Sequence, residues 1–181
     1  VSRIMKHREI FSNLLTIPPV FVRLDGRAFH RVADEWNLDR PFDERFSMAM
    51  EEVCTRLISD SGLSPDFAFT FSDEINLFFS SLPFKGRVEK IDSVTASFAA
   101  SALTLAMSSA GPLSFDARII HVTPDVAGRI HDTGCMWRLL PRLKCHEDKN
   151  DGYTLWTVYY SAALRLSFRR SPIRAGAQKS A

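Results

Sequence analysis

Between residues 20 and 122, segments with the patterns of strands and helices follow one another in a single order, and this order constrains the fold most. Residues 20–24 are a β-branched and aromatic run that ends at Asp25-Gly26, which is typical of a buried strand closing in a turn. Apolar residues spaced by three and four then predict a helix over residues 44–60, with Asp43 as its N-cap.

The second half of this region predicts a hairpin, a helix and a last strand. Phenylalanines alternate along residues 67–72, Asp73-Glu74 interrupts the pattern, and strand character resumes over residues 75–79. We therefore expect a hairpin with an acidic tip. The pattern after it predicts a helix over residues 87–107 and a strand over residues 115–122.

The resulting order, β-α-β-β-α-β, predicts an α+β fold with a ferredoxin-like sheet and both helices on one face. We expect residues 1–125 to form this core and residues 126–181 to form a C-terminal helical and basic extension. Within the extension we expect a helical turn near residues 126–131 and a final helix over residues 153–166. Because this fold hosts many functions, the order of elements alone indicates none of them.

The composition of the 181-residue chain excludes several classes of protein. Apolar residues make up 45% and charged residues 24%, which excludes a disordered chain and provides a core for one domain. No apolar run approaches the ~18–20 residues that span a bilayer, so we expect no membrane segment. Three cysteines are too few for a disulfide scaffold, and a reducing cytoplasm is the expected location.

Charge is unevenly distributed along the chain. Residues 1–137 hold 14 basic and 18 acidic residues, whereas residues 138–181 hold 9 basic and 3 acidic residues. A basic tail on a mildly acidic core is the pattern of a chain with a polyanionic partner. A solvated, frayed terminus has the same composition, so the tail indicates a partner only if the core carries nucleotide chemistry.

Three acidic residues fall where the expected sheet would bring them together. Asp25 ends the first strand, and Asp73 and Glu74 lie at the hairpin tip; in the split βαβ topology these positions share one edge of the sheet. Two carboxylates there suit two Mg²⁺ ions, because Mg²⁺ takes few protein ligands and completes its octahedron with water and phosphate oxygens. Two such ions are able to stabilise the attacking and leaving oxygens of a phosphoryl displacement.

The residues after Asp25 strengthen this interpretation. Gly26-Arg27-Ala28-Phe29-His30 offers successive backbone N–H groups, which suit an anion-binding turn for a triphosphate, and Gly26 permits close approach of the backbone. Arg23, Arg27 and Lys90 are candidate counter-charges. A purely structural interpretation stays open for each piece, because Asp-Gly is commonly only a turn and an acidic pair at a hairpin tip is commonly solvated.

Six segments of the chain, taken in order, carry a family resemblance. They are Val22–His30, Pro41–Arg45, Phe71–Glu74, Arg87–Lys90, Ala96–Ser101 and Phe115–Arg118. Together they resemble the tRNA-His guanylyltransferase family, in particular its archaeal and bacterial "like" proteins. The resemblance covers roughly residues 5–125, and its paired motifs are specific when they occur in this order.

The resemblance implies a palm-type core and a set of site residues. It places two Mg²⁺ ions on Asp25, Asp73 and the carbonyl of Gly26, and it implies that Asp25, Asp73 and Glu74 are catalytic. It implies nucleoside triphosphate binding by Asp25, Gly26, Arg27, Ala28, Phe29, His30, Ser72, Asp73 and Lys90.

The resemblance also implies an activity. Members of this family are nucleotidyltransferases that add nucleotides in the 3′–5′ direction to the 5′ end of tRNA, after ATP activates a 5′-monophosphate. The expected partners are therefore tRNA, ATP, GTP and other nucleoside triphosphates, together with further copies of the chain in a dimer or tetramer. Similarity to the "like" branch favours repair of shortened tRNA 5′ ends over obligate guanylate addition to tRNA-His.

Two other classes of function stay open. A non-catalytic tRNA- or RNA-binding protein would keep the sheet and bind through the basic tail with strong salt dependence. A nucleotide cyclase would use the same pair of metal ions and form a cyclic product without RNA.

Overall fold

The computed structural model describes Met5 and residues 8–39, 43–123, 155–160 and 165–169. The helical turn expected near residues 126–131 lies outside these residues, as does most of the expected C-terminal extension. Within the described part of the chain, no helix is both long enough and apolar enough to cross a membrane.

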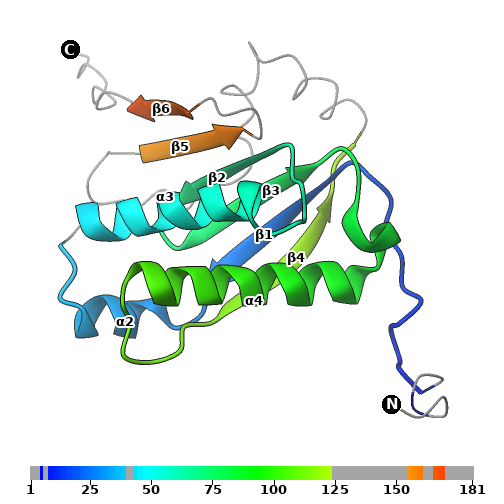
Figure 1. Cartoon of the computed structure of the whole chain (residues 1–181), viewed down its shortest axis with the longest axis horizontal. Helices are drawn as coiled ribbons and strands as arrows, with labels where there is room; N and C mark the ends of the chain where they lie inside the picture. Colours follow the sequence, from blue (N-terminus) through cyan, green and yellow to red (C-terminus); the bar gives the residue numbers. More distant parts are fainter. Residues whose placement is uncertain (1–4, 6–7, 40–42, 124–154, 161–164, 170–181) are drawn as a thin grey trace, which may run out of the picture.

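The described strands form one sheet, and two of the connections between successive strands contain helices (Figure 1). The elements are β1 (Val20–Gly26), α2 (Phe29–Glu35), α3 (Glu44–Ser59), β2 (Phe67–Phe71), β3 (Glu74–Phe79), the short 3₁₀ helix η1 (Pro83–Gly86), α4 (Val88–Ala106), β4 (Phe115–His121), β5 (Leu155–Tyr160) and β6 (Arg165–Arg169). The strand order is β4-β1-β3-β2-β5-β6, and every neighbouring pair is antiparallel. The expected combination of helices with an antiparallel sheet is confirmed.

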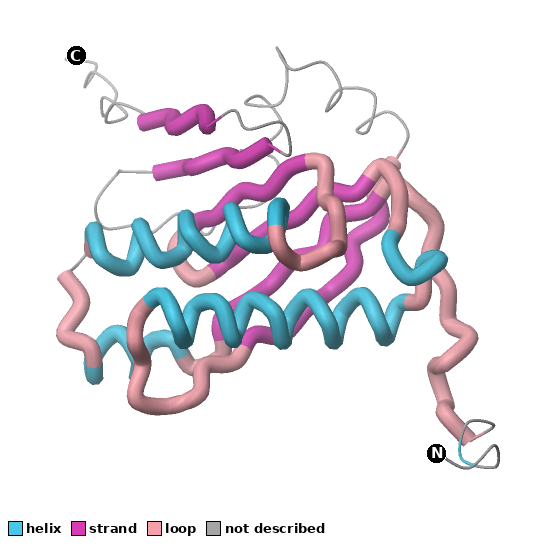
Figure 2. Tube along the Cα trace, viewed as in Figure 1, coloured by secondary structure: helices cyan, strands magenta, loops and turns pink. Residues whose placement is uncertain are grey.

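Helices α3 and α4 lie side by side over one face of this sheet (Figures 1 and 2). Alternate strand residues such as Val22, Leu24 and Leu77 belong to the same buried cluster as Leu57 of α3 and Leu103 of α4. A strand places every second side chain on one face, and the helices supply apolar stripes at their own spacing. The main core therefore fills the space between the helices and the sheet.

The opposite face of the sheet carries a second apolar group, made of phenylalanines. Phe21, Phe67, Phe69 and Phe78 are all buried. The ring of Phe21 lies 5.2 Å from that of Phe78, and the rings of Phe67 and Phe78 stack at 5.1 Å. The alternation predicted for residues 67–72 thus fixes the register of the hairpin, because a slip by one residue would exchange the two faces.

Helix α2 is an element that the sequence pattern did not predict. Ala28, which precedes it, has a left-handed backbone with φ of 59°. The helix has seven residues and buries only Phe29, whose ring lies 5.7 Å from those of both Phe46 and Phe115. A helix this short shows too few repeats for its apolar spacing to be recognised.

The helix expected over residues 153–166 is wrong. The chain instead forms strands β5 and β6; β5 pairs with β2, and β6 pairs with β5. Leu155–Tyr160 consists mostly of β-branched and aromatic residues, which favour a strand. Pairing with β5 also satisfies the backbone groups along an edge of β2 that would otherwise be unpaired.

An N-terminal arm, defined here as residues 8–19, leads into β1 and is attached to the start of α4. The amide of Thr16 donates to the carbonyl of Gly86 at 2.8 Å, and the amide of Val88 donates to Leu14 at 3.0 Å. Gly86 has φ of +74°, and a Cβ there would lie 2.5 Å from the Thr16 carbonyl oxygen. This attachment places the start of α4 at the end of the sheet where β1 begins.

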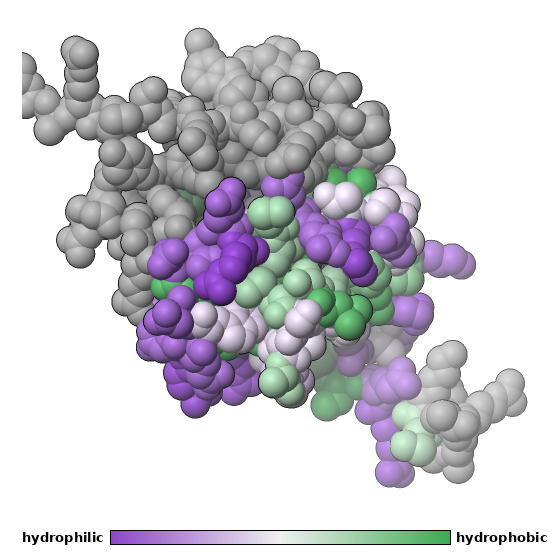
Figure 3. All heavy atoms as spheres, turned by 60° about the vertical axis from the view of Figure 1, so that its left-hand side comes forward, coloured by the Kyte–Doolittle hydropathy of each residue, from purple (hydrophilic) through white to green (hydrophobic). Residues whose placement is uncertain are grey.

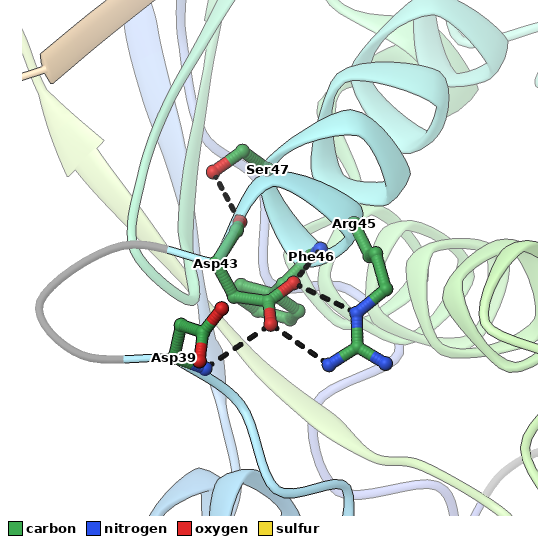
Figure 4. A network of polar contacts seen from close by, with 5 residues as sticks. All are labelled: Asp39, Asp43, Arg45, Phe46 and Ser47. Carbon is green, nitrogen blue, oxygen red and sulfur yellow. Dashed lines mark hydrogen bonds and ion pairs between the residues drawn. The ribbon is translucent and has the colours of Figure 1, made fainter.

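The predicted N-cap of α3, Asp43, is confirmed (Figure 4). Its buried carboxylate accepts hydrogen bonds from the amides of Phe46 at 3.0 Å and Asp39 at 3.1 Å. The guanidinium of Arg45 pairs with it at 2.8 Å. The hydrogen bond from Arg45, together with those two amides, holds the pKa of Asp43 well below its usual range. The cap therefore acts as a charged group.

We expect Asp43→Ala to destabilise the fold by about 1–2 kcal/mol at neutral pH, because a buried N-cap acceptor is lost. The folded-state pKa of Asp43 is depressed, so its contribution is fully present above the unfolded-state pKa of about 3.9 and is lost progressively as the pH falls from there towards the lower folded-state pKa. Urea unfolding followed by circular dichroism at pH 7 and pH 3 should therefore show a smaller difference between wild type and variant at pH 3.

Asp43→Asn is the matched control, since asparagine keeps the capping oxygen but cannot form the ion pair with Arg45. The loss of folding stability in Asp43→Asn at pH 7 measures what the negative charge of Asp43 contributes. If Asp43→Asn lost the same amount of folding stability at pH 7 and at pH 3, the ionised carboxylate would have no special role.

Candidate functional site

The end of β1 and the tip of the β2–β3 hairpin meet at one edge of the sheet. Asp25 lies opposite Glu74 in the strand register, and the amide of Gly26 donates to the carbonyl of Asp73 at 3.2 Å. Ser72, with φ of 52°, and Asp73 form the turn between the two strands. The three acidic residues singled out in the sequence are therefore brought together.

The end of β1 and the tip of the β2–β3 hairpin come closest to each other at Gly26. A Cβ on Gly26 would lie 2.4 Å from the Phe29 ring and 3.1 Å from the Cβ of Asp73. No side chain fits into that space. Since Phe29 is itself held between the rings of Phe46 and Phe115, the position of the acidic residues depends on the hydrophobic core beneath them.

Asp73 lies in an environment that disfavours its charge. Burial raises the pKa of its carboxyl above the usual value, and the negative charge of Asp25 adds to this effect. Hydrogen bonds from its own amide and from Ser72 and the nearby charge of His30 act in the opposite direction. A buried carboxyl that lies beside a second carboxylate is a common feature of functional sites.

Three carboxylates form a row across neighbouring strands. Asp25 has Glu74 opposite it on β3 and Asp116 opposite it on β4, and like charges in such positions repel. Arginines relieve part of this repulsion: Arg23 pairs with Glu74 at 3.3 Å and Arg118 with Asp116 at 3.1 Å. Among the described residues, none forms a hydrogen bond or ion pair with the Asp25 carboxylate. Of these three carboxylates, Asp25 is thus the one without a cationic partner in the described part of the chain.

Glu74 has a more constrained position than Asp25. Besides the ion pair with Arg23, its carboxylate accepts a hydrogen bond from the Asn76 side chain at 2.6 Å, and Asn76 in turn accepts one from Arg23 at 3.4 Å. Asn76 is a buried residue of the site that the sequence analysis missed. The available signal was its amide side chain within an otherwise apolar strand, between Ile75 and Leu77.

The turn after Asp25 contains exposed residues and one residue whose side chain is part of the core. Arg27, Ala28 and His30 are exposed, whereas the Phe29 side chain belongs to the core, which leaves only its backbone for a ligand. The amide of Arg27 is already bonded to the carbonyl of Ser114 at 2.9 Å. The amide of Arg31 donates to the carbonyl of Ala28 at 3.1 Å. Among the described residues, the amides of Phe29 and His30 have no backbone partner, so these are the N–H groups of the turn that are available to an anion.

Lys90 is not brought to this site. It lies in the first turn of α4, and its Nζ is 4.9 Å from the centre of the Phe84 ring. The start of α4 is attached beside the beginning of β1, whereas Asp25 lies at the end of this seven-residue strand. The two ends of the strand are about 20 Å apart, so Lys90 and the acidic residues occupy opposite ends of the sheet.

The residues present suit a hard divalent cation with few protein ligands. Asp25, Asp73 and the carbonyl of Gly26 are all oxygen donors, and a cation would offset the burial and the repulsion from Asp25 that raise the pKa of Asp73. No group of three or more His, Cys, Asp or Glu side chains able to hold a metal occurs among the described residues. The donor set therefore suits Mg²⁺, which keeps several waters, better than a metal that needs a closed cage of side chains.

Comparisons with known proteins find one matching family model and several similar folds. A family model described as tRNAHis guanylyltransferase (Thg1) matches residues 2–123. The fold is similar to that of a bacterial tRNA(His) guanylyltransferase (Thg1)-like protein in complex with GTP, with a TM-score of 0.61 and 20% identity over 86% of this chain and 82% of that one. The same type of protein in complex with ATP gives a TM-score of 0.62 and 20% identity over 86% and 83%.

A eukaryotic structure is similar to a comparable degree. The tRNA(His) guanylyltransferase from Saccharomyces cerevisiae gives a TM-score of 0.61 and 22% identity over 75% of this chain and 63% of that one. The chain thus spans less than two thirds of the yeast protein. At these identities the structural matches show a shared fold. A search of curated protein sequences found no match.

We expect Gly26→Ala to destabilise the fold by about 1–3 kcal/mol and to separate Asp25 from Asp73, because the new methyl group overlaps the Phe29 ring. Gly111→Ala is the matched control, since a Cβ there meets nothing within 4 Å. Thermal unfolding measures the first effect, and Mg²⁺ titration by calorimetry measures the second. Unchanged stability and Mg²⁺ affinity in Gly26→Ala would contradict the close packing described here.

Proposed function

The chain belongs to the tRNAHis guanylyltransferase family and is a tRNA nucleotidyltransferase, and from this premise we propose that it adds nucleotides to the 5′ end of tRNA in the 3′–5′ direction. The observation that carries the proposal is the meeting of Asp25 and Asp73 beside Gly26. A reaction between phosphates needs stabilisation of negative charge at the reacting oxygens, and this edge of the sheet has the donors to hold cations there.

Mg²⁺ is the proposed cofactor, with two ions held by Asp25, Asp73 and the carbonyl oxygen of Gly26. When bound, such ions neutralise phosphate charge and lower the barrier to displacement at phosphorus. Asp25 suits this role because it has no cation of its own among the described residues. Asp73 suits this role because its carboxylate is poorly solvated and is repelled by Asp25. A neighbouring cation would therefore stabilise the charged form of Asp73.

Other residues have supporting roles in the proposal. Glu74 is a catalytic group that acts in a fixed position, since Arg23 and Asn76 hold its carboxylate. Binding of the nucleoside triphosphate falls to Asp25, Asp73 and the turn beside them. The residues of this turn are Gly26, Arg27, Ala28, Phe29, His30 and Ser72. Lys90 of the same chain is too distant to contact a nucleotide held by these residues.

The proposed partners follow from the same chemistry. The bacterial relative was solved with GTP and with ATP, and we extend binding of these nucleotides, and tRNA as the substrate, to this chain. The strand order β4-β1-β3-β2 with its acidic edge supports a palm-type core. Repair of shortened tRNA 5′ ends, a cytoplasmic location and self-association belong to the same proposal.

The first test is extension of a tRNA that lacks its first nucleotide, with Mg²⁺ and the four nucleoside triphosphates. We expect one added nucleotide that matches the template. Asp25→Asn and Asp73→Asn should lower the rate by at least about a hundredfold, because each removes a charged metal ligand. Asp116→Asn is the matched control: Asp116 lies opposite Asp25 on the next strand but pairs with Arg118, so its loss should leave the rate nearly unchanged.

The direction of addition is tested on the same tRNA after periodate oxidation of its 3′ end, which blocks ordinary 3′ extension. Continued addition supports the 3′–5′ direction, and its loss refutes it. A cyclic nucleotide formed without RNA would instead indicate a cyclase. Salt-sensitive tRNA binding without any product would indicate a protein that only binds RNA.

A further inference from the structure

Asn76 is a buried amide between two side chains of opposite charge. Only 3% of it is exposed. In the strand register it lies opposite Arg23 of β1 on one side and Phe69 of β2 on the other. Glu74 and Phe78 stand two residues before and after it on β3, so they share its face of the sheet. Asn76 thus lies at the border between the acidic edge and the phenylalanines of this face, where an amide without partners would be costly.

The two ends of the Asn76 amide bond to groups of opposite charge. Its Nδ2 donates to Oε1 of Glu74 at 2.6 Å, and its Oδ1 accepts from Nε of Arg23 at 3.4 Å. The reversed amide would place its oxygen against the carboxylate and its NH₂ group against the guanidinium, and both contacts would be repulsive. The two charged groups therefore fix the orientation of the amide.

The ion pair between Arg23 and Glu74 differs from the usual pair of these groups. It joins Nε of Arg23 to Oε1 of Glu74 at 3.3 Å, and Oε1 is the same oxygen that accepts from Asn76. Arginine and carboxylate groups frequently form two parallel hydrogen bonds instead, which engage both carboxylate oxygens. Because Asn76 bonds to both Nε of Arg23 and Oε1 of Glu74, it stands in the way of that closed pair.

The second oxygen of Glu74, Oε2, has no hydrogen-bond partner among the described residues, and the side chain is 31% exposed. The backbone of Glu74 is fixed as well, because the buried hydroxyl of Thr70 donates to its carbonyl at 2.9 Å. Figure 3 brings forward the end of the molecule where α2 lies, directly after β1, and hydrophilic residues make up much of the described surface there. Such a surface suits water and charged ligands.

We propose that Asn76 is a positioning residue for nucleotidyl transfer: it keeps Glu74 from pairing with Arg23 through both oxygens, and so presents Oε2 of Glu74 beside Asp25. In this position Oε2 accepts a hydrogen bond from water or from a hydroxyl group of a bound nucleotide. Asn76 is buried, so it acts through Glu74 and touches no substrate. The inference rests on the proposed function, because it assigns a role in the reaction at this edge of the sheet.

Two substitutions of Asn76 remove the presented oxygen by different routes. Asn76→Leu keeps a side chain of similar size but bonds to neither charge. Arg23 is then free to form two hydrogen bonds with Glu74, which engages both oxygens. Asn76→Asp keeps an acceptor for Arg23 but places a second negative charge against Glu74, and the carboxylate is displaced by repulsion.

Steady-state kinetics of nucleotide addition to a tRNA that lacks its first nucleotide test this role. Both variants should lower kcat by at least about tenfold and change the KM for the nucleoside triphosphate by less than about threefold, because the lost contact serves the reaction and not binding. Thr95→Val is the matched control. It removes a buried hydroxyl that bonds to Ile91 within α4, so it should leave kcat unchanged.

A double-mutant cycle separates action through Glu74 from a general effect on the fold. Glu74→Gln should lower kcat by itself. Adding Asn76→Leu to Glu74→Gln should lower kcat by less than about threefold further, because the residue through which Asn76 acts has already been changed. Effects that multiply independently would overturn the proposal.

A crystal structure of the Asn76→Leu variant provides a readout that does not depend on activity. Both carboxylate oxygens of Glu74 should lie within hydrogen-bond distance of the Arg23 guanidinium. A Glu74 side chain that keeps its position and its free Oε2 would overturn the proposal. If Asn76→Leu does not fold, Asn76→Asp provides the same comparison, with the carboxylate displaced from Arg23.

Failure of this inference is distinguishable from failure of the proposed function. A wild-type chain that adds no nucleotide would refute the proposed function, and the inference with it. An active wild type together with a fully active Asn76→Leu would refute the inference alone. So would a loss in Asn76→Leu that appears only in KM.

Discussion

The site depends on the close approach of the β1 backbone to the hairpin tip at Gly26. There is no room for a Cβ between Gly26, the Phe29 ring and Asp73, and Phe29 is fixed in turn by Phe46 and Phe115. The acidic edge is therefore built on the core and not merely on a loop. Because protein cores are close-packed and transmit small displacements, a change of one methyl group at this point moves both carboxylates relative to each other.

The same edge brings several carboxylates close together, so that like charges repel one another. Elsewhere the buried carboxylate of Asp43 has two amides and an arginine as partners, so its charge stabilises the start of α3. At the acidic edge, Glu74 and Asp116 also have arginines, but Asp25 has none among the described residues and Asp73 is desolvated. Local departures from good pairing are expected where a ligand supplies the missing charge.

Much of the core was predictable from the sequence because its signals were local and repeated. The alternation of Phe67, Phe69 and Phe71 gave the hairpin, and Asp43 followed by an apolar stripe gave the start of α3. Helix α2 was missed because seven residues after a left-handed Ala28 carry too short a pattern. The expected helix over residues 153–166 is wrong because Trp156 and Val158 favour a strand and β2 offers an edge for it to pair with.

Lys90 shows the limit of transferring a role by resemblance alone. In an antiparallel sheet, β3 leaves the hairpin tip and delivers the chain to the opposite end, so a residue in the first turn of α4 starts about one strand length from Asp73. The local sequence around Lys90 does not reveal this separation, because the separation follows from the arrangement of the strands in the sheet.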